Sequence, residues 1–113
     1  MNTKYTEQEN QLARFAKAMG HPARIAILKF LASQNNCFFG DIHNVLSISK
    51  ATVSQHLAEL KNAGLIQGEI QPPKMKYCIN SENWEVAREM FCELLGSYVC
   101  CEEECWDQWI IEK

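Results

Sequence analysis

The spacing of apolar residues along the chain predicts five helices and one β-hairpin. The first helix is expected over residues 6–19, where one apolar stripe recurs at helical spacing through Leu12, Phe15, Ala16 and Met19. Gly20 ends this helix, and a second is expected from Pro22 to about Ala32, because proline is well tolerated in the first turn of a helix. Residues 1–32 are therefore expected to hold a pair of N-terminal helices.

Two further helices separated by a short turn are expected over residues 40–63. The first covers residues 40–46, and the second starts after Ser49, a residue type that suits the N-cap of a helix. The second helix carries an apolar stripe at Val53, Leu57 and Leu60. Two short helices of this kind, the second with a polar outer face, form a helix-turn-helix.

A hairpin and a last helix follow. Residues 65–79 contain two strand-like runs, and Pro72 and Pro73 belong at the turn between them because proline has no amide hydrogen for the ladder. The last helix is expected over residues 81–110, with an apolar face at Ala87, Met90, Phe91, Leu94 and Tyr98. This order of elements predicts a mainly α fold with a β-hairpin wing, a winged helix-turn-helix.

Size and charge agree with one small domain. The 113 residues are 47% hydrophobic and 22% charged, so residues 1–113 are expected to fold as one domain around one core. The net charge of −3 is unevenly distributed. Residues 1–80 contain nine Lys or Arg against five Asp or Glu, whereas residues 81–113 contain two against nine. An acidic tail therefore hides a basic body, which is typical of a DNA-binding domain.

Apolar runs along the chain are short. None exceeds four residues, and the first ten residues lack the apolar centre of a signal peptide. We therefore expect a soluble cytoplasmic protein with no membrane partner, whose thiols are reduced.

Several linked motifs give the chain a specific resemblance. They are FAKAMGHPARIAIL at residues 15–28, GDI at 40–42, SKATVSQHLAEL at 49–60, and AGLI at 63–66 leading to Tyr77. Their order resembles that of the ArsR/SmtB family of small dimeric repressors, which sense arsenic, metals or thiol-reactive species. The similarity covers roughly residues 12–80. It implies a homodimer that binds double-stranded operator DNA.

The second helix of the helix-turn-helix is expected to read the major groove. Its polar side chains suit this, because Gln can pair with adenine edges and Lys50 can meet a phosphate or guanine. Ser54, Gln55 and His56 match family positions that face DNA. With the wing lysines included, the predicted DNA-binding residues are Ser49, Lys50, Thr52, Ser54, Gln55, His56, Lys74 and Lys76. The Pro-Pro tip of the wing departs from the basic-Glu-Gly-Arg tip common in the family.

A dimer is expected because one reading helix neutralises few phosphates, whereas two-fold partners reach half-sites about one DNA turn apart. The resemblance implies that the first and last helices form the dimer interface. Apolar residues that suit such an interface are Leu12, Phe15, Met90, Leu94 and Tyr98.

Cysteines are concentrated at the end of the chain. Four of the six, Cys92, Cys100, Cys101 and Cys105, lie in the last 22 residues. Three thiolates suit the pyramidal geometry of As(III) or Sb(III), and vicinal cysteines with a third nearby resemble the C-terminal arsenite sites of some family members. The predicted inducer site is therefore Cys100, Cys101 and Cys105, holding As(III) or Sb(III), with no organic cofactor. A regular helix would separate Cys100 from Cys101 by about 100°, so the site needs local loosening or a second chain.

Other sensor sites of the family are incomplete in this sequence. The arsenic site of the helix-turn-helix reads Cys-Val-Cys-Asp-Leu, but residues 38–42 here read Phe-Phe-Gly-Asp-Ile, and Cys37 is one residue out of register. The zinc site of the last helix needs histidine, and none follows His56. Cys78 and Cys92 are expected to pack in the fold, although a ligand role for Cys37 or Cys92 stays open.

These observations predict a repressor that releases its operator when As(III) or Sb(III) binds. One alternative is a repressor of the same fold that responds to thiol oxidation or persulfides. Another is a soft-metal carrier that keeps the helix-turn-helix only as a fold. An enzyme is not expected, because no nucleophile and base arrangement and no Gly-rich phosphate loop is present.

Overall fold

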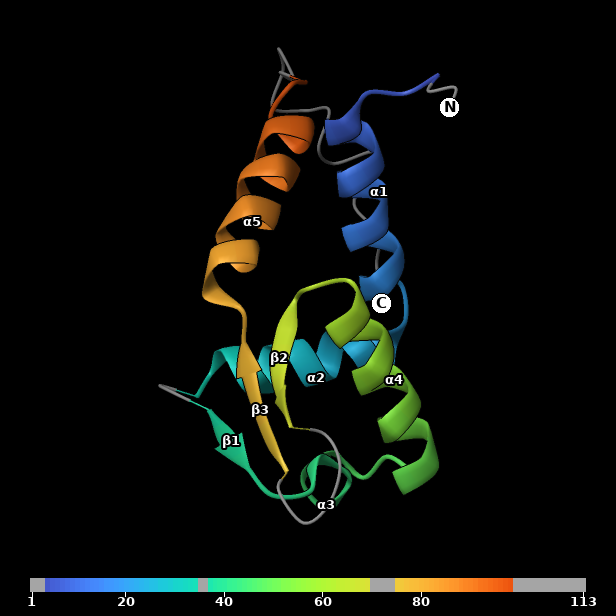
Figure 1. Ribbon diagram of the computed structural model, residues 1–113, viewed down its shortest axis with the longest axis vertical. Helices are drawn as coiled ribbons and strands as arrows, with labels where there is room; N and C mark the ends of the chain where they lie inside the picture. The colour runs from blue at the N-terminus through green and yellow to red at the C-terminus, as the bar shows by residue number, and fades with distance from the viewer. Residues whose placement is uncertain (1–3, 35–36, 70–74, 99–113) are drawn as a thin grey trace, which may run out of the picture.

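The computed structural model of the protein describes residues 4–34, 37–69 and 75–98. The elements are α1 (Glu7–Met19), α2 (Pro22–Ala32), β1 (Phe38–Phe39), α3 (Ile42–Leu46), α4 (Lys50–Asn62), β2 (Ile66–Glu69), β3 (Lys76–Ile79) and α5 (Ser81–Leu95). Helices α1 and α5 pack against each other at one end of the molecule, and the sheet lies with α2, α3 and α4 toward the other (Figure 1). The predicted mainly α fold with a hairpin wing is confirmed.

The helices begin and end where local side chains complete their hydrogen bonds. Thr6 and Glu9 form a reciprocal capping box at the start of α1. The turn of the helix-turn-helix passes through Ser47, which has a left-handed backbone with φ of 58°. Ser49 then caps α4 by accepting a hydrogen bond from the backbone N–H of Thr52 at 3.3 Å. These contacts set the angle at which α4 leaves the turn.

The sheet is antiparallel and has the strand order β1-β3-β2. Strands β2 and β3 form the predicted hairpin, with Gln67 opposite Cys78. Strand β1 was not predicted, because two residues are too short for a recognisable period. It pairs with the other edge of β3, placing Phe38 opposite Tyr77. The segment that leads into the helix-turn-helix is thus attached to the wing.

The core lies where α1, α2, α4 and the sheet meet. Its fully buried large side chains are Tyr77, Phe15, Ile27, Leu31, Ile42, Leu57, Leu60, Leu65 and Ile66. Phe15 is only 2% exposed, so its predicted place in the dimer interface is wrong. The helical stripe of α1 is wide enough to face both the core and the outside, and its spacing alone does not separate the two.

Helix α5 is shorter than predicted. It ends at Leu95, where the N–H of Gly96 donates to the carbonyl of Cys92 at 2.8 Å. Glycine is a poor helix former, which explains the end at this position. The rest of the predicted helix, beyond residue 98, lies outside the described residues. Among the helices that are described, none is long and apolar enough to cross a membrane.

Candidate nucleic-acid interface

Helix α4 presents a polar, solvent-exposed surface. Val53, Leu57 and Leu60 are buried and fix the helix to the core. The opposite side exposes four of the predicted DNA-binding residues, Lys50, Thr52, Ser54 and Gln55, beside the exposed cap Ser49. The hydroxyls of Ser49 and Thr52 lie 2.7 Å apart in a hydrogen bond, which orders the first turn. These side chains can donate to phosphates and to base edges, and we refer to α4 as the reading helix.

His56 does not belong to this exposed surface. It is only 6% exposed, so its predicted exposure toward DNA is wrong. Its Nδ1 accepts a hydrogen bond from Arg24 Nε at 2.9 Å, and the ring of His21 lies 4.5 Å away between centroids. Burial lowers the pKa of His56, and the positive charges of His21 and Arg24 lower it further. His56 is therefore neutral near pH 7 and carries its proton on Nε2.

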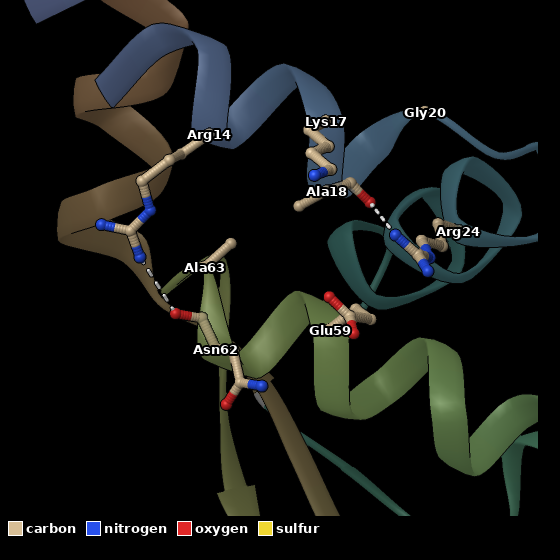
Figure 2. Close-up of a pocket in the computed structure, with 8 residues that line it drawn as sticks. All are labelled: Arg14, Lys17, Ala18, Gly20, Arg24, Glu59, Asn62 and Ala63. Atoms are coloured by element: carbon tan, nitrogen blue, oxygen red, sulfur yellow. Dashed lines mark hydrogen bonds between the residues drawn. The ribbon is translucent and has the colours of Figure 1, made fainter. Parts of the chain in front are cut away.

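Arg24 connects three helices. Besides His56 on α4, it donates through Nη1 to the carbonyl of Ala18 at the end of α1, at 3.2 Å (Figure 2). From the sequence, Arg24 was expected only as part of a family motif, with no role of its own. No local signal indicated that role, because its partners lie 6 and 32 residues away. Arg24 therefore holds the reading helix in place through its buried side.

A pocket of about 580 Å³ lies beside this connection, and Figure 2 shows the residues that line it. Its cations are Arg14, Lys17 and Arg24, and Glu59 lies across from Arg24. Arg14 donates to the carbonyl of Asn62 at 3.4 Å. Both arginines thus satisfy carbonyl groups at the ends of helices, where positive charge also complements the helix dipole. The positive charges of Arg14 and Arg24 therefore have a structural role at these helix ends.

The wing contributes one described lysine. Lys76 is exposed on β3, and its Nζ lies 5.7 Å from the ring centroid of Phe39 on β1. Its position at the hairpin fits a contact with the DNA backbone. Lys61 joins the wing to the reading helix by donating to the carbonyl of Gly68 at 3.0 Å. The other predicted wing lysine, Lys74, lies outside the described residues.

The cysteines differ from expectation. Cys37 and Cys78, the latter half-buried on β3, form a disulfide, so the expectation of reduced thiols is wrong at this pair. The local sequence gave no sign of it because β1, which brings the two residues together, was not predicted. Cys92 is exposed and free, contrary to its predicted packing role.

The predicted inducer residues Cys100, Cys101 and Cys105 lie outside the described residues. Within the residues that are described, no group of three or more His, Cys, Asp or Glu side chains is arranged to hold a metal ion.

The surface where α1 and α5 meet carries apolar side chains among polar ones. A shallow pocket of about 310 Å³ between the two helices is lined in part by Leu12, Met90 and Leu94. Leu94 is 54% exposed and Tyr98 75% exposed. Four of the five residues predicted for the dimer interface therefore lie at least partly on the surface, whereas Phe15 does not.

Comparison with known proteins identifies the fold. Residues 21–67 match the bacterial regulatory protein, arsR family. The chain is 33% identical over 72 residues to the HTH-type transcriptional regulator YgaV of Escherichia coli, covering 64% of this chain and 73% of YgaV. It is 29% identical over 72 residues to the HTH-type transcriptional regulator CmtR of Mycobacterium bovis, covering 64% of this chain and 60% of CmtR.

Solved structures agree. HlyU from Vibrio cholerae matches with a TM-score of 0.62 at 25% identity, covering 80% of this chain and 97% of HlyU. Reduced HlyU from the same organism matches with a TM-score of 0.60 at 26% identity, covering 85% of this chain and 95% of HlyU. The named relatives are transcriptional regulators and not enzymes. The chain belongs to the ArsR family of bacterial regulatory proteins and is a DNA-binding transcriptional regulator with a winged helix-turn-helix.

Proposed function

We propose that the protein is a homodimeric repressor that binds operator DNA through α4 and releases it when As(III) or Sb(III) binds Cys100, Cys101 and Cys105. The proposed DNA binding is supported by the different character of the two sides of α4. Its apolar side is locked into the core, and its first turns expose Lys50, Thr52, Ser54 and Gln55. A helix held in this way can enter the major groove with its N-terminal residues against base edges.

The homodimer is supported by the exposed apolar residues of α5. Leu94 and Leu95 at the end of α5, and Tyr98 just after it, are all more than half exposed, whereas most other described large apolar residues are buried or partly buried. Covering such a patch with a second copy removes apolar surface from water. Two copies also double the number of phosphate contacts and match a two-fold symmetric operator.

The inducer site is supported by the chemistry of the tail. Cys100, Cys101 and Cys105 place three soft ligands within six positions. The glutamates between them disfavour free thiolates, so the thiols would ionise chiefly when a thiophilic ion binds. A metalloid bound to these cysteines, which follow α5 in the sequence, would change the angle between protomers and the spacing of the reading helices.

The test is an anaerobic titration of the reduced protein on labelled DNA from its own upstream region, followed by fluorescence anisotropy. Arsenite is expected to release the DNA near stoichiometrically, and Cys101→Ser or Cys105→Ser should abolish the release. Cys92→Ser is the matched control, because Cys92 is a free thiol on α5 outside the proposed site. Normal release in the Cys101→Ser and Cys105→Ser variants would contradict the metalloid site, and absence of DNA binding would favour the carrier alternative.

A second candidate is a repressor of the same fold that responds to thiol oxidation. The observation in its favour is the Cys37–Cys78 disulfide within the DNA-binding half of the molecule. One similar structure, from Vibrio cholerae, is of a reduced form of HlyU. A change in DNA affinity on oxidation by a polysulfide, with no response to arsenite, would favour this candidate.

A further inference from the structure

Cys37 and Cys78 face each other across two antiparallel strands. The ladder between β1 and β3 pairs Phe38 with Tyr77 and Phe39 with Lys76. Cys37 and Cys78 are the next pair in this register, and their Cα atoms are 4.4 Å apart. This separation is typical of an antiparallel pair without mutual hydrogen bonds, where side chains approach most closely. The sheet itself therefore brings the two sulfurs together.

The bond encloses the DNA-binding elements. Its cysteines are 41 residues apart, and α3, α4 and β2 all lie between them. Without the bond, β1 is attached to β3 by a two-residue ladder and by the N–H of Gly40, which donates to the carbonyl of Met75 at 3.1 Å. Figure 1 shows β1 on the edge of β3 opposite β2, continuing into α3. The position of the helix-turn-helix relative to the wing thus depends on this short attachment.

We propose that Cys37 and Cys78 are a reversible redox site whose disulfide strengthens DNA binding. This rests on the proposed function as a DNA-binding repressor. Both residues are partly exposed, so small thiols and disulfides can reach them. A protein that binds genomic DNA works where thiols are kept reduced, and a disulfide formed there is usually transient and responds to oxidants. The proposed inducer site is separate, because it consists of Cys100, Cys101 and Cys105.

The chemistry needs only a low-molecular-weight disulfide as oxidant. One cysteine thiolate attacks a sulfur of that disulfide, forms a mixed disulfide and displaces one thiolate. The second cysteine thiolate attacks the protein sulfur of the mixed bond, which closes Cys37–Cys78 and displaces the other thiolate. The two cysteines lose two electrons and two protons, and the external disulfide becomes two thiols. A dithiol reverses both steps.

The oxidised form should bind more tightly because it is more ordered. The proposed DNA contacts come from the reading helix and from Lys76 on β3, so both must keep one relative position in the complex. The disulfide restricts that position before binding, so less conformational entropy is lost when DNA binds. Reduction leaves the core intact, and β1 is then attached to β3 only by the two-residue ladder and the Gly40 hydrogen bond. We expect an affinity ratio between about 5- and 150-fold, the usual range for coupling between two sites.

The experiment uses a full-length variant that keeps only this pair, with Cys92, Cys100, Cys101 and Cys105 changed to Ser. Oxidised glutathione should join Cys37 to Cys78, detected as a peptide pair lighter by two hydrogen atoms. Adding Cys78→Ser removes the pair and is the matched control. Circular dichroism checks that each variant is folded. If no linked peptide forms in the folded protein, the proposal is overturned.

Anisotropy then compares the oxidised and reduced forms on upstream DNA and on an unrelated duplex at low salt. Tighter binding by the oxidised form, lost with Cys78→Ser, supports the proposal. Equal affinity in both forms, tighter binding by the reduced form, or no binding to either duplex overturns it. If upstream DNA is bound no better than the unrelated duplex, operator recognition fails as a separate hypothesis, and the redox ratio on the unrelated duplex still decides the switch.

Discussion

Arg24 donates a hydrogen bond from Nε to Nδ1 of His56 at 2.9 Å, and this contact joins α2 to the buried side of the reading helix. A second hydrogen bond from Arg24 reaches the carbonyl of Ala18 on α1. His56 therefore positions α4 instead of touching DNA. The contact requires neutral His56, because a protonated imidazole has no lone pair to accept the Arg24 hydrogen bond.

The stability of the protein should fall at acidic pH through His56. Burial, and then the charges of His21 and Arg24, lower its pKa below the ordinary value near 6.5. Between these two pKa values the unfolded chain binds more protons than the folded one, so the free energy of unfolding rises with pH. The stabilisation is present above about pH 6.5 and is lost as the pH falls toward the folded-state pKa.

Urea unfolding at pH 7.5 and pH 5.5 measures this effect. His56→Asn keeps an acceptor near the position of Nδ1 but does not titrate, so it should lose less stability than the unmodified protein over this interval. His43→Asn is the control, because His43 is a partly exposed histidine 3.8 Å from Asp41. An unchanged pH dependence in His56→Asn would contradict the prediction.

Gln55→Ala should weaken binding to upstream DNA by about 1–3 kcal/mol, the range for loss of a paired base contact. Gln55 is exposed on α4 and is not needed for the core, so folding should be unaffected. Anisotropy on upstream and unrelated DNA separates base recognition from backbone binding. Lys29→Gln on the exposed surface of α2 is the control. An equal loss on both DNAs would assign Gln55 to phosphate contact instead.

Lys76→Ala should weaken binding to all DNA sequences similarly. If Lys76 meets one phosphate, the slope of log affinity against log salt should become shallower by about 0.9. Titrations at several salt concentrations give this slope. A steep slope equal to that of the unmodified protein would place Lys76 away from the DNA.

Gly68→Ala should destabilise the wing. Gly68 has a φ of +133°, and a Cβ there would overlap the carbonyl oxygen of Lys76 on β3. The backbone conformation alone should reduce the free energy of unfolding by about 1–3 kcal/mol. Gly20→Ala is the matched control, because its Cβ would meet no atom closer than 3.4 Å. Urea midpoints for both variants test the difference, and equal midpoints would refute it.

Leu94→Glu should weaken the proposed homodimer. Leu94 is 54% exposed on α5, and a carboxylate buried there without a partner would lose its hydration. The dimer dissociation constant should rise at least about tenfold, which sedimentation velocity measures. Glu89→Gln, about 140° around α5 from Leu94, is the control. An unchanged dissociation constant for Leu94→Glu would show that Leu94 lies outside the dimer interface.

Local patterns were sufficient for the helices, the hairpin and the exposed side of α4. Helical periodicity reports a side chain's direction relative to its own helix, and Gly and Ser residues mark helix ends. The polar residues Lys50, Thr52, Ser54 and Gln55 were therefore correctly predicted as exposed. A period does not report what packs on each side of a helix, which is why the predicted positions of Phe15 and His56 were wrong.

Contacts between distant segments were decided by the tertiary structure. Arg24 meets His56 across 32 residues, and Cys37 meets Cys78 across 41. Both contacts depend on how α2, β1 and β3 are brought together by burial of the core, and burial of apolar surface is not directional. The sequence thus specifies which elements form and which surface of α4 is polar. Packing alone determines that His56 holds the buried side of the reading helix. It also determines that Cys37 and Cys78 form a disulfide on either side of that helix in the sequence.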